Sequence, residues 1–128
     1  MIKTAIVGVG NCASALVQGV NYCKGDAGKP EGILFPNLGG YAPDDIEFVA
    51  AFDVDVRKVG KPLADAIFAS PNNTLRFHDG SISDAVSVSR GAVLDGVSPA
   101  MRGCDDLNFQ PIDEPGASKD EVVSLLKD

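Results

Sequence analysis

The amino-acid sequence predicts an α/β fold with a small parallel sheet. Short apolar, β-branched runs at 2–7 and 46–52 are typical of buried strands, and a helical pattern follows each of them. Strands that alternate with helices form parallel sheets, because each helix returns the chain to the same end of the sheet. The 128 residues suit one hydrophobic core, so we expect residues 1–128 to form a single domain.

The first strand, at 2–7, stops at Gly8. Apolar residues then recur at helical spacing, at Ala13, Leu16, Val17 and Val20. Residues 24–45 are rich in glycine and proline, which favours a surface insertion. The second strand, at 46–52, ends in Asp53.

A second helical pattern covers 56–69, but Pro62 lies inside it. Because proline lacks a backbone N–H, the helix either starts near Pro62 or bends there. Residues 74–77 and 86–89 are short strand candidates, which either pair with each other or extend the edge of the sheet.

The C-terminal part is less regular. Residues 98–117 show no periodic pattern and predict an irregular segment, whereas Ser118 and Glu121 form a capping box that predicts the start of a helix. A parallel sheet needs a strand after that helix, and none follows before residue 128. We therefore expect a sheet truncated before its later strands, with an unpaired edge that allows a homo-oligomer.

The composition excludes several classes of protein. The formal net charge of −7, from 18 acidic and 11 basic side chains, argues against a nucleic-acid partner. No apolar run approaches the ~18–20 residues of a membrane span, and the N-terminus has no secretory pattern. Cys12, Cys23 and Cys104 have no CxxC spacing, which indicates neither a disulfide framework nor a metal site. A cytoplasmic protein is expected.

A glycine motif carries the strongest functional signal. Between the first strand and the first helix lie Gly8, Gly10 and Ala13, in the spacing GxGxxA of a dinucleotide-binding turn. Gly8 allows the tight turn, Gly10 allows a diphosphate to approach the backbone, and Ala13 packs the helix on the strand. The amides of residues 10–13, including those of Asn11 and Cys12, would face the diphosphate. The alternative is a purely structural turn.

Asp53 is the second candidate, because an acidic residue at this strand end accepts hydrogen bonds from the adenine ribose. It lies 45 residues after Gly8, and the insertion at 24–45 explains the surplus over the usual ~20. An acidic side chain repels a 2′-phosphate, so NAD is favoured over NADP. The alternative is that Asp53 caps the next helix. Asn72 and Asn73 could reach the adenine end, although a plain turn is favoured for both.

Several segments together resemble one family, the inositol-3-phosphate synthases (also called myo-inositol-1-phosphate synthases) of actinobacterial and archaeal type. The resemblance runs from residue 2 to about 97 and rests on AIVGVGNCAS at 5–14, LVQGV at 16–20, FVAAFDVD at 48–55, KVG at 58–60, DAIFAS at 65–70 and NNT at 72–74. It implies a Rossmann-type NAD-binding unit of an isomerase in inositol and phospholipid biosynthesis. Such enzymes convert D-glucose 6-phosphate to 1D-myo-inositol 3-phosphate by internal NAD redox chemistry and aldol cyclisation, and they are usually tetramers.

The family's catalytic lysines, substrate-phosphate loop and oligomerisation sheet come later in its chain, so no catalytic residue can be carried over. Residues 97–101 also depart from the family's pattern. We therefore expect the NAD-binding portion of a truncated homologue, with glucose 6-phosphate as a partner only if a catalytic half completes it. The alternatives are a stand-alone NAD-binding or subunit-interaction module, as a virus or mobile element could encode, and a fragment with a structural role only.

The 128-residue polypeptide alone is expected to show no inositol phosphate formation from glucose 6-phosphate; measurable turnover would contradict this.

Overall fold

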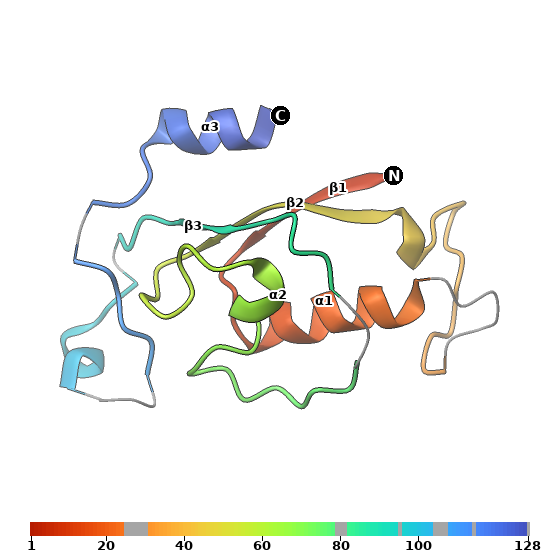
Figure 1. Ribbon diagram of the computed structural model, residues 1–128, viewed down its shortest axis with the longest axis horizontal. Helices are drawn as coiled ribbons and strands as arrows, with labels where there is room; N and C mark the ends of the chain where they lie inside the picture. Colours follow the sequence, from red (N-terminus) through yellow and green to blue (C-terminus); the bar gives the residue numbers. More distant parts are fainter. Residues whose placement is uncertain (25–30, 79–81, 95, 104–107, 114, 128) are drawn as a thin grey trace.

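Three parallel strands form one sheet in the computed structural model, in the order β1 (Ile2–Val7), β2 (Ile46–Asp53) and β3 (Val88–Arg90) (Figure 1). The helices are α1 (Asn11–Cys23), α2 (Leu63–Ala66) and α3 (Lys119–Lys127), with 3-10 turns at Pro43–Asp45 and Pro99–Gly103. The structure describes residues 1–24, 31–78, 82–94, 96–103, 108–113 and 115–127. The predicted α/β class with a partial Rossmann-type parallel sheet is confirmed.

The strand register brings the ends of the three strands to one edge of the sheet. β1 pairs with β2 from Ile2 opposite Ile46 to Val7 opposite Phe52, with one shift in register after Thr4. β2 pairs with β3 up to Asp53 opposite Arg90. Because all three strands run in the same direction, their carboxyl ends meet at a common edge, which is where open α/β sheets bind ligands.

The main core lies on the face of the sheet that α1 and α2 cover (Figure 1). Its buried members are Ile6, Val9, Ala13, Val17, Ala51, Leu63, Ala66, Ile67 and Val88. α3 lies on the other side of the sheet and has no buried residue. The helical spacing predicted for α1 is confirmed for Ala13, Val17 and Val20, which are buried, whereas Leu16 is 47% exposed. None of the helices in the described ranges is long and apolar enough to cross a membrane.

Of the helix predicted at 56–69, only Leu63–Ala66 is helical, and the expected start near Pro62 is confirmed. Residues 56–60 form turns, and α2 begins at Leu63 after Pro62. Gly60 has a φ of +82°, and its amide donates to the Val88 carbonyl at 2.8 Å. Residues 60–63 thus bond to the chain around β3 instead of to a helical turn, and the helix starts near its proline.

The two short strand candidates have different outcomes. β3 overlaps the prediction at 86–89 and extends the sheet edge beside β2. The prediction at 74–77 is wrong, because the fully buried side chain of Gln18 bonds this segment. Its amide donates to the Leu75 carbonyl at 3.2 Å and its oxygen accepts from the Phe77 amide at 3.0 Å.

The capping box of α3 is confirmed. The Ser118 amide donates to Glu121 Oε2 at 2.6 Å, and the Glu121 amide donates to Ser118 Oγ at 3.3 Å. Within the predicted insertion at 24–45, residues 25–30 lie outside the described residues, and the part from 31 onward is largely exposed. Within 98–117, residues 104–107 and 114 also lie outside them.

Candidate functional site

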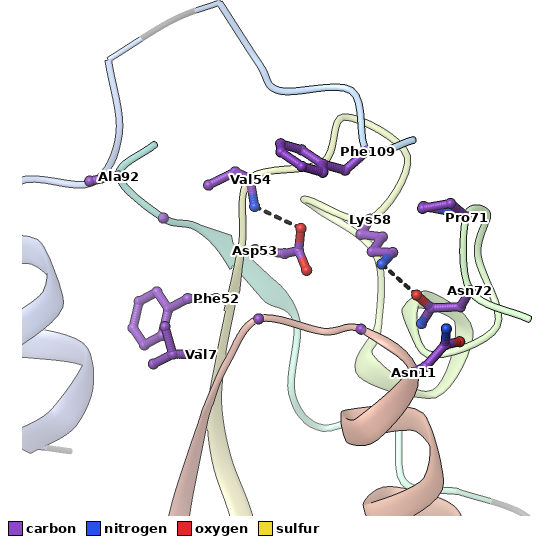
Figure 2. A pocket seen from close by; sticks show the side chains of 13 residues that line it. Val7, Asn11, Phe52, Asp53, Val54, Lys58, Pro71, Asn72, Ala92 and Phe109 are labelled. Carbon is purple, nitrogen blue, oxygen red and sulfur yellow. Dashed lines mark hydrogen bonds between the residues drawn. The ribbon is translucent and has the colours of Figure 1, made fainter. Parts of the chain in front are cut away.

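A pocket of about 540 Å³ lies at the carboxyl ends of β1 and β2, in front of the first turn of α1 (Figure 2). Five parts of the chain line it: the turn at 8–10, here called the glycine turn, the residues that end and follow β2, the loop after α2, residues 91–92 after β3, and Phe109. The lining residues on which the site depends are Gly8, Gly10, Asn11, Asp53, Val54, Lys58, Asn72 and Phe109.

The glycine turn leaves open space toward this pocket. Gly8 has a φ of +91°, which favours glycine, whereas Gly10 has an ordinary φ of −91°. A Cβ built on Gly10 meets nothing within 4 Å. Neither strain nor packing within the described chain therefore requires glycine at position 10, whereas a ligand that approaches the backbone would require it.

The N-terminus of α1 is open to an anion. Gly10 is the N-cap, it provides no side-chain cap, and the first turn carries no acidic residue. The first amides of a helix have no partner within the helix, and they carry the positive end of its dipole. The Ser14 amide is the first to bond back, to the Gly10 carbonyl at 2.9 Å.

Asp53 lies at the predicted strand end and lines the pocket. Its Oδ2 accepts a hydrogen bond from the Val9 amide at 2.7 Å. Its Oδ1 accepts from the amides of Val54 at 2.7 Å and Asp55 at 2.8 Å. The two hydrogen bonds to Oδ1 resemble the alternative in which Asp53 caps the next helix, although a turn and not a helix follows. The carboxylate therefore links the end of β2 to the glycine turn.

Lys58 is a site residue for which the sequence predicts no role. Its side chain is only 3% exposed, and its Nζ donates to the Val9 carbonyl at 2.7 Å. The same Nζ donates to Asn72 Oδ1 at 2.8 Å (Figure 2). Burial lowers the pKa of Lys58, although the nearby carboxylates of Asp53 and Asp55 act in the opposite direction. Only its place in the KVG segment marked it in the sequence.

The asparagine pair lies beside the glycine turn. Asn72 forms a turn through its amide, which donates to the Ala69 carbonyl, and its side-chain nitrogen donates to the Val9 carbonyl at 3.0 Å. The Asn73 amide donates to Asn11 Oδ1 at 2.8 Å, and Asn73 does not line the pocket. A contact of either asparagine with a ligand stays a prediction.

The other predicted residues of the glycine motif have different surroundings. Asn11 is exposed and lines the pocket, and its Oδ1 also accepts from Thr74 Oγ1 at 2.8 Å. Cys12 is exposed but does not line the pocket. Ala13 is buried in the core between α1 and the sheet, the packing role for which it was predicted.

A partly buried ion pair, Asp55–Arg57, follows the end of β2 next to the site. Asp55 is fully buried, and Arg57 binds both of its carboxylate oxygens, with Nε–Oδ1 at 2.9 Å and Nη2–Oδ2 at 2.7 Å. Burial raises the pKa of the Asp55 carboxyl, but hydrogen bonds from Arg57 and from the Gln110 amide outweigh it and hold the pKa below its ordinary value.

The same pair holds residues 108–112, here called the strap, against the chain after β2. Arg57 Nη2 donates to the Asn108 carbonyl at 2.6 Å, and the Val56 amide donates to the Gln110 carbonyl at 2.8 Å. Phe109 of the strap thereby lines the pocket, on the far side of Asp53 from the glycine turn (Figure 2). No motif in the sequence marks Phe109.

These features define a partial Rossmann-type α/β unit: a parallel sheet, a glycine turn that opens a helix, and an aspartate at the end of the next strand. A solved structure named Ari2 matches 79% of this chain with a TM-score of 0.63 and 38% identity. A myo-inositol-1-phosphate synthase-related protein from Thermotoga maritima matches 99% of it with a TM-score of 0.56 and 23% identity, which supports the fold alone.

The sequence comparison finds relatives that are named inositol-3-phosphate synthase. The chain is 44% identical over 128 residues to an inositol-3-phosphate synthase from Mycobacterium tuberculosis, an alignment that covers 98% of this chain. The chain is thus a homologue of the inositol-3-phosphate synthases, as the resemblance implied. This chain spans 35% of the length of that relative. No protein-family model matches this chain.

Proposed function

We propose that this chain binds NAD in the pocket beside the glycine turn and is the NAD-binding portion of an inositol-3-phosphate synthase homologue. The observation that carries the proposal is the open N-terminus of α1 in front of Gly10, where no side chain caps the helix. A dinucleotide diphosphate is an anion of suitable size and charge for that position.

The diphosphate would accept hydrogen bonds from the amides of residues 10–13. Gly10 allows the approach, because a Cβ at this position would project into space that is open in the protein. Asn11 and Cys12 would contribute through their backbone amides, and Ala13 through its packing under the helix. Gly8 provides the turn that directs the chain into α1.

Asp53 would hold the adenine ribose. A carboxylate offers about four acceptor positions, and three backbone amides use three of those on Asp53. The remaining capacity can accept one ribose hydroxyl, whereas a 2′-phosphate would meet a negative charge. NAD is therefore expected to bind more tightly than NADP.

When bound, NAD would supply the hydride acceptor for the family's conversion of glucose 6-phosphate to inositol 3-phosphate. The residues of this chain bind and orient the cofactor in that scheme, and no catalytic group is assigned to them. Glucose 6-phosphate would become a partner only together with the catalytic half of such a synthase. The alternative of a stand-alone NAD-binding or subunit-interaction module is not favoured, since the similarity to the synthases covers 98% of the chain.

Replacing Gly10 with alanine is expected to weaken NAD binding about tenfold or more while the fold stays intact, because the new methyl group meets only the ligand. Calorimetric titration with NAD and NADP, together with urea denaturation, measures both effects. Gly19→Ala is the matched control: its Cβ also meets nothing within 4 Å, but Gly19 lies in the middle of α1, away from the pocket.

The control is expected to bind NAD normally and to be more stable by roughly 0.5–1 kcal/mol, since alanine favours a helix interior over glycine. Unchanged NAD affinity in Gly10→Ala would contradict the proposed position of the diphosphate. Absence of NAD binding by the unaltered chain would contradict the proposed function as a whole.

A further inference from the structure

Both peptide groups that flank Val9 are held by side chains from other parts of the chain. The Val9 amide donates to Asp53 Oδ2 at 2.7 Å. The Val9 carbonyl accepts from Lys58 Nζ at 2.7 Å and from Asn72 Nδ2 at 3.0 Å. The residue between the two glycines thus has three polar anchors, here called the Val9 anchors: Asp53, Lys58 and Asn72.

These contacts fix the direction of the next amide. A peptide unit is planar and trans, so the carbonyl of Val9 and the N–H of Gly10 point in opposite directions within one rigid group. A carbonyl held by two donors therefore fixes the orientation of the Gly10 amide. Without those donors, the peptide could rotate, since Gly10 has unusual backbone freedom.

The anchors also balance charge at the pocket. Among the described residues that line the pocket, Asp53 and Lys58 are the charged ones, and the neighbouring Asp55 is paired with Arg57 at 2.7 Å. Without Lys58, the described part of the pocket wall would carry the negative charge of Asp53 alone. An anionic ligand would then be repelled, whereas a neutral one would be little affected.

We propose that Lys58 is a positioning residue for the diphosphate: its ammonium fixes the Val9–Gly10 peptide and offsets the charge of Asp53, so that the glycine turn is set for an anion before the ligand arrives. This inference rests on the proposed NAD site and adds a residue to it. Lys58 acts through the peptide group and the local potential, and it takes no part in chemistry.

The test is Lys58→Met, which keeps an unbranched buried side chain and removes the charge and the donor. ADP and adenosine serve as probes, since both carry the nucleoside and only ADP carries the diphosphate. We expect the dissociation constant for ADP to rise about tenfold to a hundredfold, and that for adenosine to change by about twofold at most. Lys61→Met, at an exposed lysine outside the pocket, is the matched control and should change neither by more than about twofold.

A second measurement on the unaltered chain covers the case in which Lys58→Met fails to fold. Asp53, Asp55 and Arg57 are the charged groups that act on Lys58, and burial lowers its pKa below the ordinary 10.5. ADP affinity, relative to adenosine, should therefore fall as the pH rises toward 10.5 and Lys58 loses its proton.

The outcomes separate the two proposals. Equal weakening of ADP and adenosine in Lys58→Met would indicate a purely structural lysine and overturn the inference. An unchanged affinity for ADP, or a flat pH profile of the unaltered chain, would do the same. Failure of the unaltered chain to bind NAD and ADP would overturn the proposed function, and the inference with it.

Discussion

Replacing Arg57 with methionine is expected to lower the free energy of unfolding by about 3–5 kcal/mol. The substitution leaves the carboxylate of Asp55 fully buried without the guanidinium that binds both of its oxygens. It also removes the bond from Arg57 to the Asn108 carbonyl, which holds the strap. Urea denaturation followed by circular dichroism measures the loss, and Arg76→Met, whose guanidinium lies over the Phe68 ring, is a control expected to cost about 1 kcal/mol or less.

The Asp55–Arg57 pair also predicts how the stability of the protein depends on pH. The pKa of Asp55 in the folded protein lies below its ordinary value of 3.8. Its ionised form therefore stabilises the fold at pH values above 3.8, and this contribution is lost as the pH falls through the lowered pKa. In Arg57→Met, burial still raises the pKa of Asp55, but the guanidinium that lowers it is gone. As the pH falls, the variant should therefore lose stability at a higher pH than the unaltered protein does. Equal acid transitions for the two proteins would contradict the assigned role of the pair.

Replacing Asp53 with alanine is the second prediction with a large effect. Three backbone amides lose their acceptor, and two of the bonds to them are 2.7 Å long. Because Asp53 is half-buried, water can satisfy part of this loss, and we expect a cost of about 2–3 kcal/mol in the free energy of unfolding. NAD affinity should fall at least about a hundredfold, since the ribose acceptor and one of the Val9 anchors disappear together.

Two further variants make the Asp53 experiment specific. Asp53→Asn keeps one oxygen for the amides of Val54 and Asp55 and should be more stable than Asp53→Ala, yet it loses the charge that opposes a 2′-phosphate. Its preference for NAD over NADP should therefore shrink. Asp44→Ala, at an exposed residue in the 3-10 turn before β2, should change the unfolding free energy by no more than about 0.5 kcal/mol. Normal NAD binding by folded Asp53→Ala would refute the proposed site.

The parts of the fold that depend on local patterns could be predicted from the sequence. The strand at 2–7, the position of the glycine turn, α1 and the capping box of α3 each have a recognisable pattern in neighbouring residues. The position of Asp53 could be predicted as well, because the apolar run that marks its strand is recognisable after the long insertion at 24–45.

What could not be predicted depends on contacts between distant residues. The turn at 60–63 exists because its backbone bonds to residues 86–88, which the helical pattern at 56–69 does not reveal. Lys58 reaches a carbonyl 49 positions away, and Asp55 reaches an amide 55 positions away. Both partners are backbone groups, which carry no signature in a sequence.

The way in which the glycine turn is held has a consequence for variation at position 9. All three anchors bind the main chain of Val9, and its side chain is fully buried in the core. Every encoded amino acid except proline supplies the same amide and carbonyl. Tolerance at this position is therefore set by the volume and polarity of the core, and the residue at the centre of the motif can change its identity without altering the chemistry that it presents.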